Sequence, residues 1–92
     1  MDKVKVETLK NANGCIVKNH YVIKTKEGIY FQSYNDTIVF IPKDSDKKFL
    51  DKNFWDRSSS TRMRRCQFLK ESHAETKFLL CTGKYQLIDL NS

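Results

Sequence analysis

The chain has 92 residues, of which 39% are apolar and 12% aromatic, so it can form one modest core and we expect a single domain, 1–92. Its formal net charge of +6 favours anionic partners and argues against an acidic mimic of DNA. No apolar run approaches the roughly 18 residues that cross a membrane, and the first residues lack the layout of a signal peptide. We therefore expect no membrane partner. A chain of this length also leaves little room for a deep catalytic cleft beside its core.

The first half of the chain is rich in strand-forming residues separated by turn signals. Lys26, Glu27 and Gly28 form a short hairpin connection, in which Gly28 can take a positive φ, and Asn35 and Asp36 form a second turn. Short connections between consecutive strands predict an antiparallel meander. The predicted strands cover residues 3–9, 15–25, 29–34 and 37–41.

A charged loop at 43–48 separates this meander from the rest of the chain. Residues 49–51 are expected to form a short edge strand. Phe54 and Trp55 are predicted to be an aromatic anchor that holds the following segment against the core.

A first helix is expected to extend to Lys70, with Asp56 and the hydroxyl residues 58–61 as candidates for its N-cap. Apolar residues recur at helical spacing along it and predict the side that faces the core. This stripe consists of Met63, Cys66 and Leu69.

A second helix is predicted to begin at Ser72, because Glu75 three residues later completes a capping box. It runs to about Thr82, and Gly83 stands where a C-terminal glycine is favoured. Its expected apolar face carries Ala74, Phe78 and Cys81, and residues 84–90 form a last strand. The predicted fold class is α+β: a mostly antiparallel sheet of four to five strands with two short helices packed on one face.

The arginines are concentrated in one short segment. All four lie within nine residues: Arg57, Arg62, Arg64 and Arg65. A helix at about 100° per residue brings Arg57 and Arg64 together near Thr61 and Phe68, opposite the apolar stripe. Arg65 then lies to one side. Arg62 borders the stripe, where it can instead fold back to a carboxylate.

A guanidinium binds phosphate or carboxylate through two parallel hydrogen bonds, which lysine cannot form. The hydroxyls and amides of Ser58, Ser59 and Ser60 would add anion-binding groups at the start of the helix. This segment is therefore predicted to bind a partner protein or nucleic acid. The alternative is a solvated basic face with Phe68 in the core. The predicted binding residues are Tyr34, Arg57, Thr61, Arg62, Arg64 and Arg65.

Tyr34 joins this set because aromatic rings on a sheet can stack on single-stranded bases. Strand alternation points Tyr30 and Phe31 to opposite faces, so at least one of them belongs to the core. Tyr30 and Gln32 would share a face with Tyr34, which is the candidate exposed face.

Neither histidine falls in a pattern that ties it to a serine or cysteine nucleophile, so we expect no enzymatic activity. Three cysteines, Cys15, Cys66 and Cys81, favour packed free thiols in a reducing cytosol. Cys66, His73 and Cys81, with His20 elsewhere, lack the close pairs typical of zinc sites. No metal or other cofactor is expected.

The segments 28–40 and 50–58 resemble a family of small uncharacterised proteins encoded by phages and other mobile elements of Gram-positive bacteria. The similarity spans roughly residues 28 to 69. At 57–61 this chain has Arg-Ser-Ser-Ser-Thr where the family pattern has Tyr-Ser-Arg-Thr-Thr, so arginine occupies a different position. The residues that fit the family outline are Phe31, Gln32, Ser33, Tyr34, Leu50, Asp51, Trp55, Asp56, Phe68 and Leu69.

The resemblance implies an accessory protein of a mobile element that works in the cytoplasm of a bacterial host cell. Such small proteins often bind and block a host factor, including defence systems such as CRISPR effectors. The implied partner is a host protein or ribonucleoprotein complex. The alternative is a module that binds the backbone phosphates of DNA or RNA through the same arginines.

Overall fold

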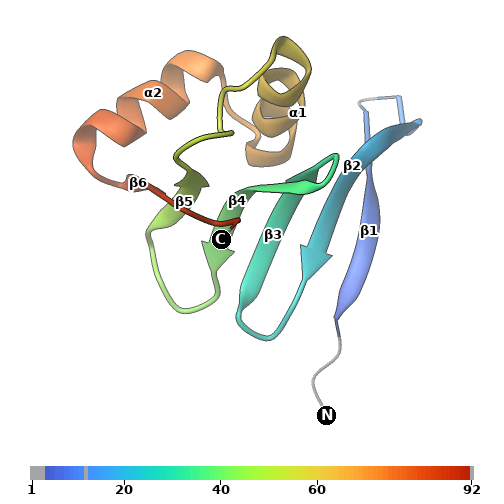
Figure 1. Ribbon diagram of the computed structural model, residues 1–92, viewed down its shortest axis with the longest axis horizontal. Helices are drawn as coiled ribbons and strands as arrows, with labels where there is room; N and C mark the ends of the chain where they lie inside the picture. Colours follow the sequence, from blue (N-terminus) through green and yellow to red (C-terminus); the bar gives the residue numbers. More distant parts are fainter. Residues whose placement is uncertain (1–3, 12, 92) are drawn as a thin grey trace.

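The structure, a computed structural model, describes residues 4–11 and 13–91 and confirms the predicted α+β class (Figure 1). The sheet has six strands rather than four to five. The elements are β1 (Lys5–Lys10), β2 (Ile16–Lys24), β3 (Gly28–Ser33), β4 (Asp36–Pro42), β5 (Lys48–Asp51), α1 (Ser59–Leu69), α2 (His73–Thr82) and β6 (Tyr85–Ile88).

The strands lie in the sheet in the order in which they occur in the chain, from β1 to β6. The pairs from β1 to β5 are antiparallel, as the predicted meander requires, whereas β6 pairs with β5 in parallel. A parallel neighbour needs a crossover connection, and α1 and α2 provide it. The prediction that residues 49–51 form an edge strand is therefore wrong, because β5 lies between β4 and β6.

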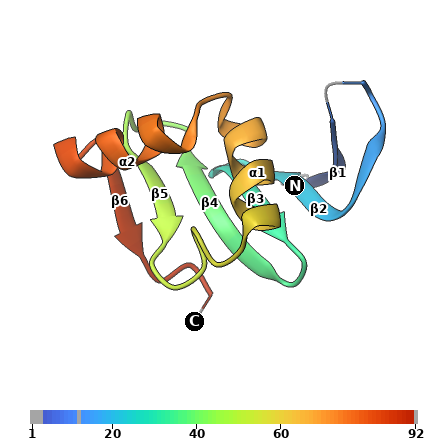
Figure 2. The same cartoon turned by 90° about the horizontal axis from the view of Figure 1, so that it is seen from above.

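Both helices cover the same side of the sheet (Figure 2). The ring of Phe68 in α1 stacks on that of Phe31 in β3, with ring centroids 5.1 Å apart. Phe54 and Trp55, in the segment that enters α1, pack against the core as predicted. The buried apolar residues are Leu9, Val17, Phe31, Ile38, Val39, Leu50, Leu69 and Tyr85.

The predicted helix ends are confirmed. The Ser58 hydroxyl accepts a hydrogen bond from the backbone N–H of Thr61 and caps α1. The capping box of Ser72 and Glu75 begins α2, and Gly83 ends it with a φ of 85°. These features depend on residues within one turn of each other, which is why the sequence predicts them well.

The predicted core-facing side is wrong for α2 and only partly right for α1, where Leu69 of the predicted stripe is buried and Cys66 is partly buried. In α1 the fully or largely buried residues are Thr61, Arg65 and Leu69, whereas Met63 is 56% exposed. In α2 the residues predicted to face the core, Ala74, Phe78 and Cys81, are all exposed. Thr76 is buried instead, and Leu79 and Leu80 pack against the core. The apolar run 78–81 is continuous, so its periodicity does not identify the buried face.

The face of the sheet away from the helices carries a row of stacked rings. Phe40 pairs across the sheet with Tyr30 on one side and with Phe49 on the other, at centroid distances of 4.5 and 6.3 Å. Phe31 is fully buried on the helix side, which confirms that Tyr30 and Phe31 point to opposite faces. The rings of this row pack on one another.

Gly28 begins β3 where two backbones approach closely. A Cβ atom at this position would lie 2.2 Å from the carbonyl oxygen of Ile41, and the backbone φ is 153°. Only glycine can occupy the position without displacing β4. No helix in the described part of the chain combines the length and the apolar character that crossing a membrane requires.

Candidate partner-binding surface

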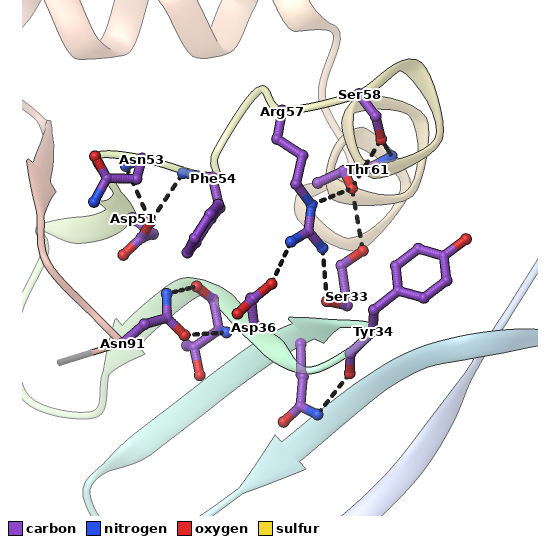
Figure 3. A network of polar contacts seen from close by, with 12 residues as sticks. Ser33, Tyr34, Asp36, Asp51, Asn53, Phe54, Arg57, Ser58, Thr61 and Asn91 are labelled. Atoms are coloured by element: carbon purple, nitrogen blue, oxygen red, sulfur yellow. Dashed lines mark hydrogen bonds and ion pairs between the residues drawn. The ribbon is translucent and has the colours of Figure 1, made fainter.

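Arg57 connects the start of α1 to the turn between β3 and β4 through hydrogen bonds (Figure 3). It precedes the N-cap Ser58 and is not part of the helix. Its guanidinium donates to the Asp36 carboxylate, to the Ser33 carbonyl at 2.8 Å and to the Thr61 hydroxyl at 3.5 Å. The Arg57 side chain thus holds the start of α1 to the sheet, and its charge is paired with the Asp36 carboxylate.

Thr61 lies at the interface between α1 and the sheet. It is fully buried, and its hydroxyl lies 3.2 Å from that of Ser33, which in turn lies 3.1 Å from Nε2 of His20. The prediction that Thr61 is exposed on a binding face is wrong, because this buried polar chain gives the hydroxyl its partners within the protein.

Tyr34 lies in the turn after β3 and is 48% exposed. Its φ of 57° places it in the left-handed region, which is unusual for a bulky residue and ends the alternation of the strand. The ring therefore contacts His20, at a centroid distance of 5.4 Å, and the Arg57 guanidinium, at 5.8 Å. The expectation that Tyr34 continues the face of Tyr30 and Gln32 is wrong, whereas Tyr34 and Arg57 do come together.

Arg62 folds back onto Asp56, as the sequence allowed. Nε and Nη2 of Arg62 donate to the two carboxylate oxygens of Asp56 at 2.7 and 3.1 Å, which is a bidentate pair. The hydrogen bonds from Arg62 are the main cause that lowers the pKa of Asp56. Arg62 is exposed but its charge is already neutralised.

Arg65 is fully buried, so the prediction that it contacts a partner from the side of α1 is wrong. It donates to the carbonyl of Trp55 and to Nδ1 of His73, the latter at 2.8 Å. Its guanidinium carbon lies 4.9 Å from the centroid of the Trp55 ring. These acceptors, which come from the segment before α1 and from α2, allow a charged side chain to be buried. Burial is the main cause that lowers the pKa of Arg65.

Arg64 differs from the other three arginines. It is half-buried, donates to Oε1 of Gln67 at 3.0 Å, and makes no ion pair with any carboxylate in the described part of the chain. It lines a surface pocket of about 530 Å³ between α1 and the turn that joins β1 to β2. We call this the hairpin pocket. Its lining residues are Lys10, Asn11, Asn13, Arg64, Gln67 and Lys70.

Gln67 connects the two sides of the hairpin pocket. Its Oε1 accepts from Arg64, and its Nε2 donates to the backbone carbonyl of Lys10. Lys70, at the left-handed C-cap of α1, and Lys10 add two further cations. Three formal positive charges thus surround the pocket, and none of its described lining residues is acidic.

Sequence reasoning identified Arg64 but missed the rest of this pocket. The side chain of Asn11 accepts hydrogen bonds from the backbone N–H groups of Asn13 and Cys15, which shape the connection between β1 and β2. Nothing local predicts that this connection lies beside α1. Gln67 and Lys10 are 57 residues apart, so their contact depends on the whole sheet.

All three cysteines are free. Cys66 is partly buried, as expected, but Cys15 and Cys81 are exposed, which corrects the prediction of packed thiols. Within residues 4–11 and 13–91, no group of three or more histidine, cysteine or acidic side chains is arranged to hold a metal ion.

We expect His73 to make the stability of the protein depend on pH. Nδ1 must be unprotonated to accept from Arg65, and partial burial, followed by the charge of Arg62, lowers the pKa of His73 from its ordinary 6.5. The unfolded chain therefore binds this proton more readily than the folded one. The contribution of His73 to the free energy of unfolding should have its full value above pH ~6.5. It should decrease as the pH falls toward the lower pKa that His73 has in the folded protein.

Urea unfolding followed by circular dichroism at about pH 7.5 and pH 5 measures this dependence. Replacing His73 with glutamine keeps an acceptor for Arg65 but removes the titration. The pH dependence of His73→Gln should be weaker than that of the unchanged protein, and equal slopes for the two proteins would contradict the assignment.

Comparison with known protein families, with curated proteins and with solved structures finds no match to this chain.

Proposed function

We propose that the chain is a small accessory binding protein, of the type that phages and other mobile elements encode, which inhibits or redirects a host protein or ribonucleoprotein complex. It acts by binding and not by catalysis. The observation that carries the proposal is the hairpin pocket, where Lys10, Arg64 and Lys70 surround a cavity without an acidic lining residue in the described chain.

The pairing of the arginines supports a partner at this place. Arg57 and Arg62 bind carboxylates of the same chain, and Arg65 is buried. Arg64 keeps its charge available beside two lysines. Unpaired cations on one surface attract an anionic partner over a distance and fix its orientation on arrival.

The sequence resemblance supports the class of partner. A defence complex such as a CRISPR effector contains RNA, so it offers both an anionic surface and a reason for a mobile element to encode an inhibitor. Such a target would be met in the cytoplasm of the bacterial host.

The test is co-purification from a Gram-positive host with the tagged chain and two charge-reversal variants. Arg64→Glu reverses the charge in the hairpin pocket. Lys43→Glu makes the same type of change in an exposed residue after β4, at the end of the sheet away from the pocket (Figure 1).

We expect a host factor in stoichiometric amount with the unchanged chain and with Lys43→Glu, and its loss with Arg64→Glu. Equal recovery with both variants would show that the pocket is not the contact. Recovery of no stoichiometric host factor at moderate salt would overturn the proposal.

A second candidate function is a module that binds nucleic acid directly, without a host protein. The observation that favours it is the number of hydrogen-bond donors around the pocket, from three cations and the side-chain amides of Asn11 and Asn13. In this case binding to purified nucleic acid should need no further component.

A further inference from the structure

We infer that the hairpin pocket binds the phosphodiester backbone of a nucleic acid strand. The inference rests on the proposed function, since it names the chemical group that the partner presents to the same surface. It follows from the charge of the pocket, from the hydrogen-bonding atoms that its residues leave unused, and from the way Arg64 is held.

The charge of the pocket exceeds what a single side-chain carboxylate would neutralise. Lys10 and Lys70 are exposed and Arg64 is half-buried, so their charged ends can reach a ligand that enters the pocket. A nucleic acid strand presents a phosphate at every nucleotide and can engage several cations at once.

The hydrogen-bonding atoms of the lining indicate a ligand that only accepts. Oδ1 of Asn11 already accepts from the backbone N–H groups of Asn13 and Cys15, at 2.9 and 3.0 Å. Oε1 of Gln67 is used by Arg64, and the carbonyl of Lys10 by Gln67.

Among the described lining residues, Asn13 alone retains a side-chain acceptor without a hydrogen bond to another described residue. The other side-chain groups that remain free are N–H donors. A phosphodiester has acceptors and no donors, whereas an acidic peptide segment would also bring backbone N–H groups that need acceptors.

Gln67 fixes the position of Arg64. Gln67 accepts from the Arg64 guanidinium and donates to the backbone of β1, so Arg64 is oriented before a ligand arrives. Arg64 therefore loses less conformational freedom on binding. No aromatic residue is among the described residues that line the pocket, so none of them offers an aromatic ring for a base to stack on. Binding should therefore be independent of sequence.

Fluorescence anisotropy with labelled oligonucleotides tests the inference. The probes are a single-stranded RNA, a single-stranded DNA and a duplex DNA, each in two unrelated sequences. For single strands, neutralisation of one phosphate by each of three cations gives a slope of log affinity against log salt of magnitude about 2. We expect this slope and no preference between the two sequences.

Charge variants locate the binding site. Arg64→Gln should reduce the magnitude of the salt slope by about 0.7, and Arg64→Glu should weaken binding by about tenfold or more. Lys43→Glu should have much less effect. Circular dichroism spectra and unfolding curves that match those of the unchanged protein establish that the variants are folded.

Competition decides between phosphate and carboxylate. Polyphosphate should displace the labelled strand, and polyglutamate at the same charge concentration should not. Equal displacement by polyglutamate, a flat salt response, or binding that Arg64→Glu leaves unchanged would each overturn the inference. If no probe binds but the host factor is still recovered in an Arg64-dependent way, the phosphodiester inference fails and the proposed function stands.

Discussion

Replacing Arg65 with alanine should lower the free energy of unfolding by about 3–5 kcal/mol. The side chain is fully buried, and its removal leaves a cavity between α1 and the segment that carries Trp55. It also removes the donor to the Trp55 carbonyl and to Nδ1 of His73. Urea unfolding at neutral pH, where His73 is unprotonated in the folded state, measures the loss.

Arg65→Met separates the cavity from the charge. Methionine fills most of the volume and can keep contact with the Trp55 ring, and it also removes the cost of burying a guanidinium, whose Nε has no hydrogen-bond partner among the described residues. The loss for Arg65→Met should therefore be clearly smaller than for Arg65→Ala. A loss below about 1 kcal/mol for the alanine variant would mean that Arg65 is not buried as described.

Replacing Asp51 with alanine should lower the free energy of unfolding by about 2–4 kcal/mol. Asp51 ends β5 and is fully buried. Oδ2 accepts from the backbone N–H groups of Asn53 and Phe54 at 3.0 and 2.9 Å, and Oδ1 accepts from that of Leu90 at 2.8 Å. Alanine would leave three backbone donors without their acceptor.

Two further variants make the Asp51 experiment specific. Asp51→Asn keeps the shape of the side chain and one acceptor oxygen. Its free energy of unfolding should therefore lie between those of the unchanged protein and Asp51→Ala. Asp44→Ala removes a carboxylate from the exposed loop between β4 and β5 and should change the free energy of unfolding by no more than about 0.5 kcal/mol. Similar losses for Asp51→Ala and Asp44→Ala would contradict the role assigned to Asp51.

Local signals in the sequence predicted much of the fold. The capping box of Ser72 and Glu75, the glycine after α2 and the hairpin at Gly28 each depend on neighbouring residues, and all three are confirmed. The strand pattern gave the antiparallel meander for the same reason. The parallel position of β6 depends on where two helices return the chain, which short-range patterns do not contain.

The candidate site was only partly predictable, because residues far apart in the sequence determine whether each arginine is paired, buried or exposed. Asp36 binds Arg57, and His73 and the Trp55 carbonyl allow Arg65 to be buried, so that the buried side of α1 is turned away from the predicted apolar stripe. A helix that buries polar residues cannot be oriented by apolar periodicity alone. Arg64 was correctly expected to point to the surface, but its neighbours across the pocket come from the start of the chain.

The bridge from Gln67 to the carbonyl of Lys10 also joins the β1–β2 hairpin to α1. A ligand that binds residues on both sides of this bridge favours the conformations in which hairpin and helix are together, and so opposes local opening of the hairpin. Backbone amides of β1 should then exchange with solvent deuterium more slowly in the complex than in the free protein. Occupation of the pocket would thus be detectable in a strand at the edge of the sheet, at amides that touch no ligand.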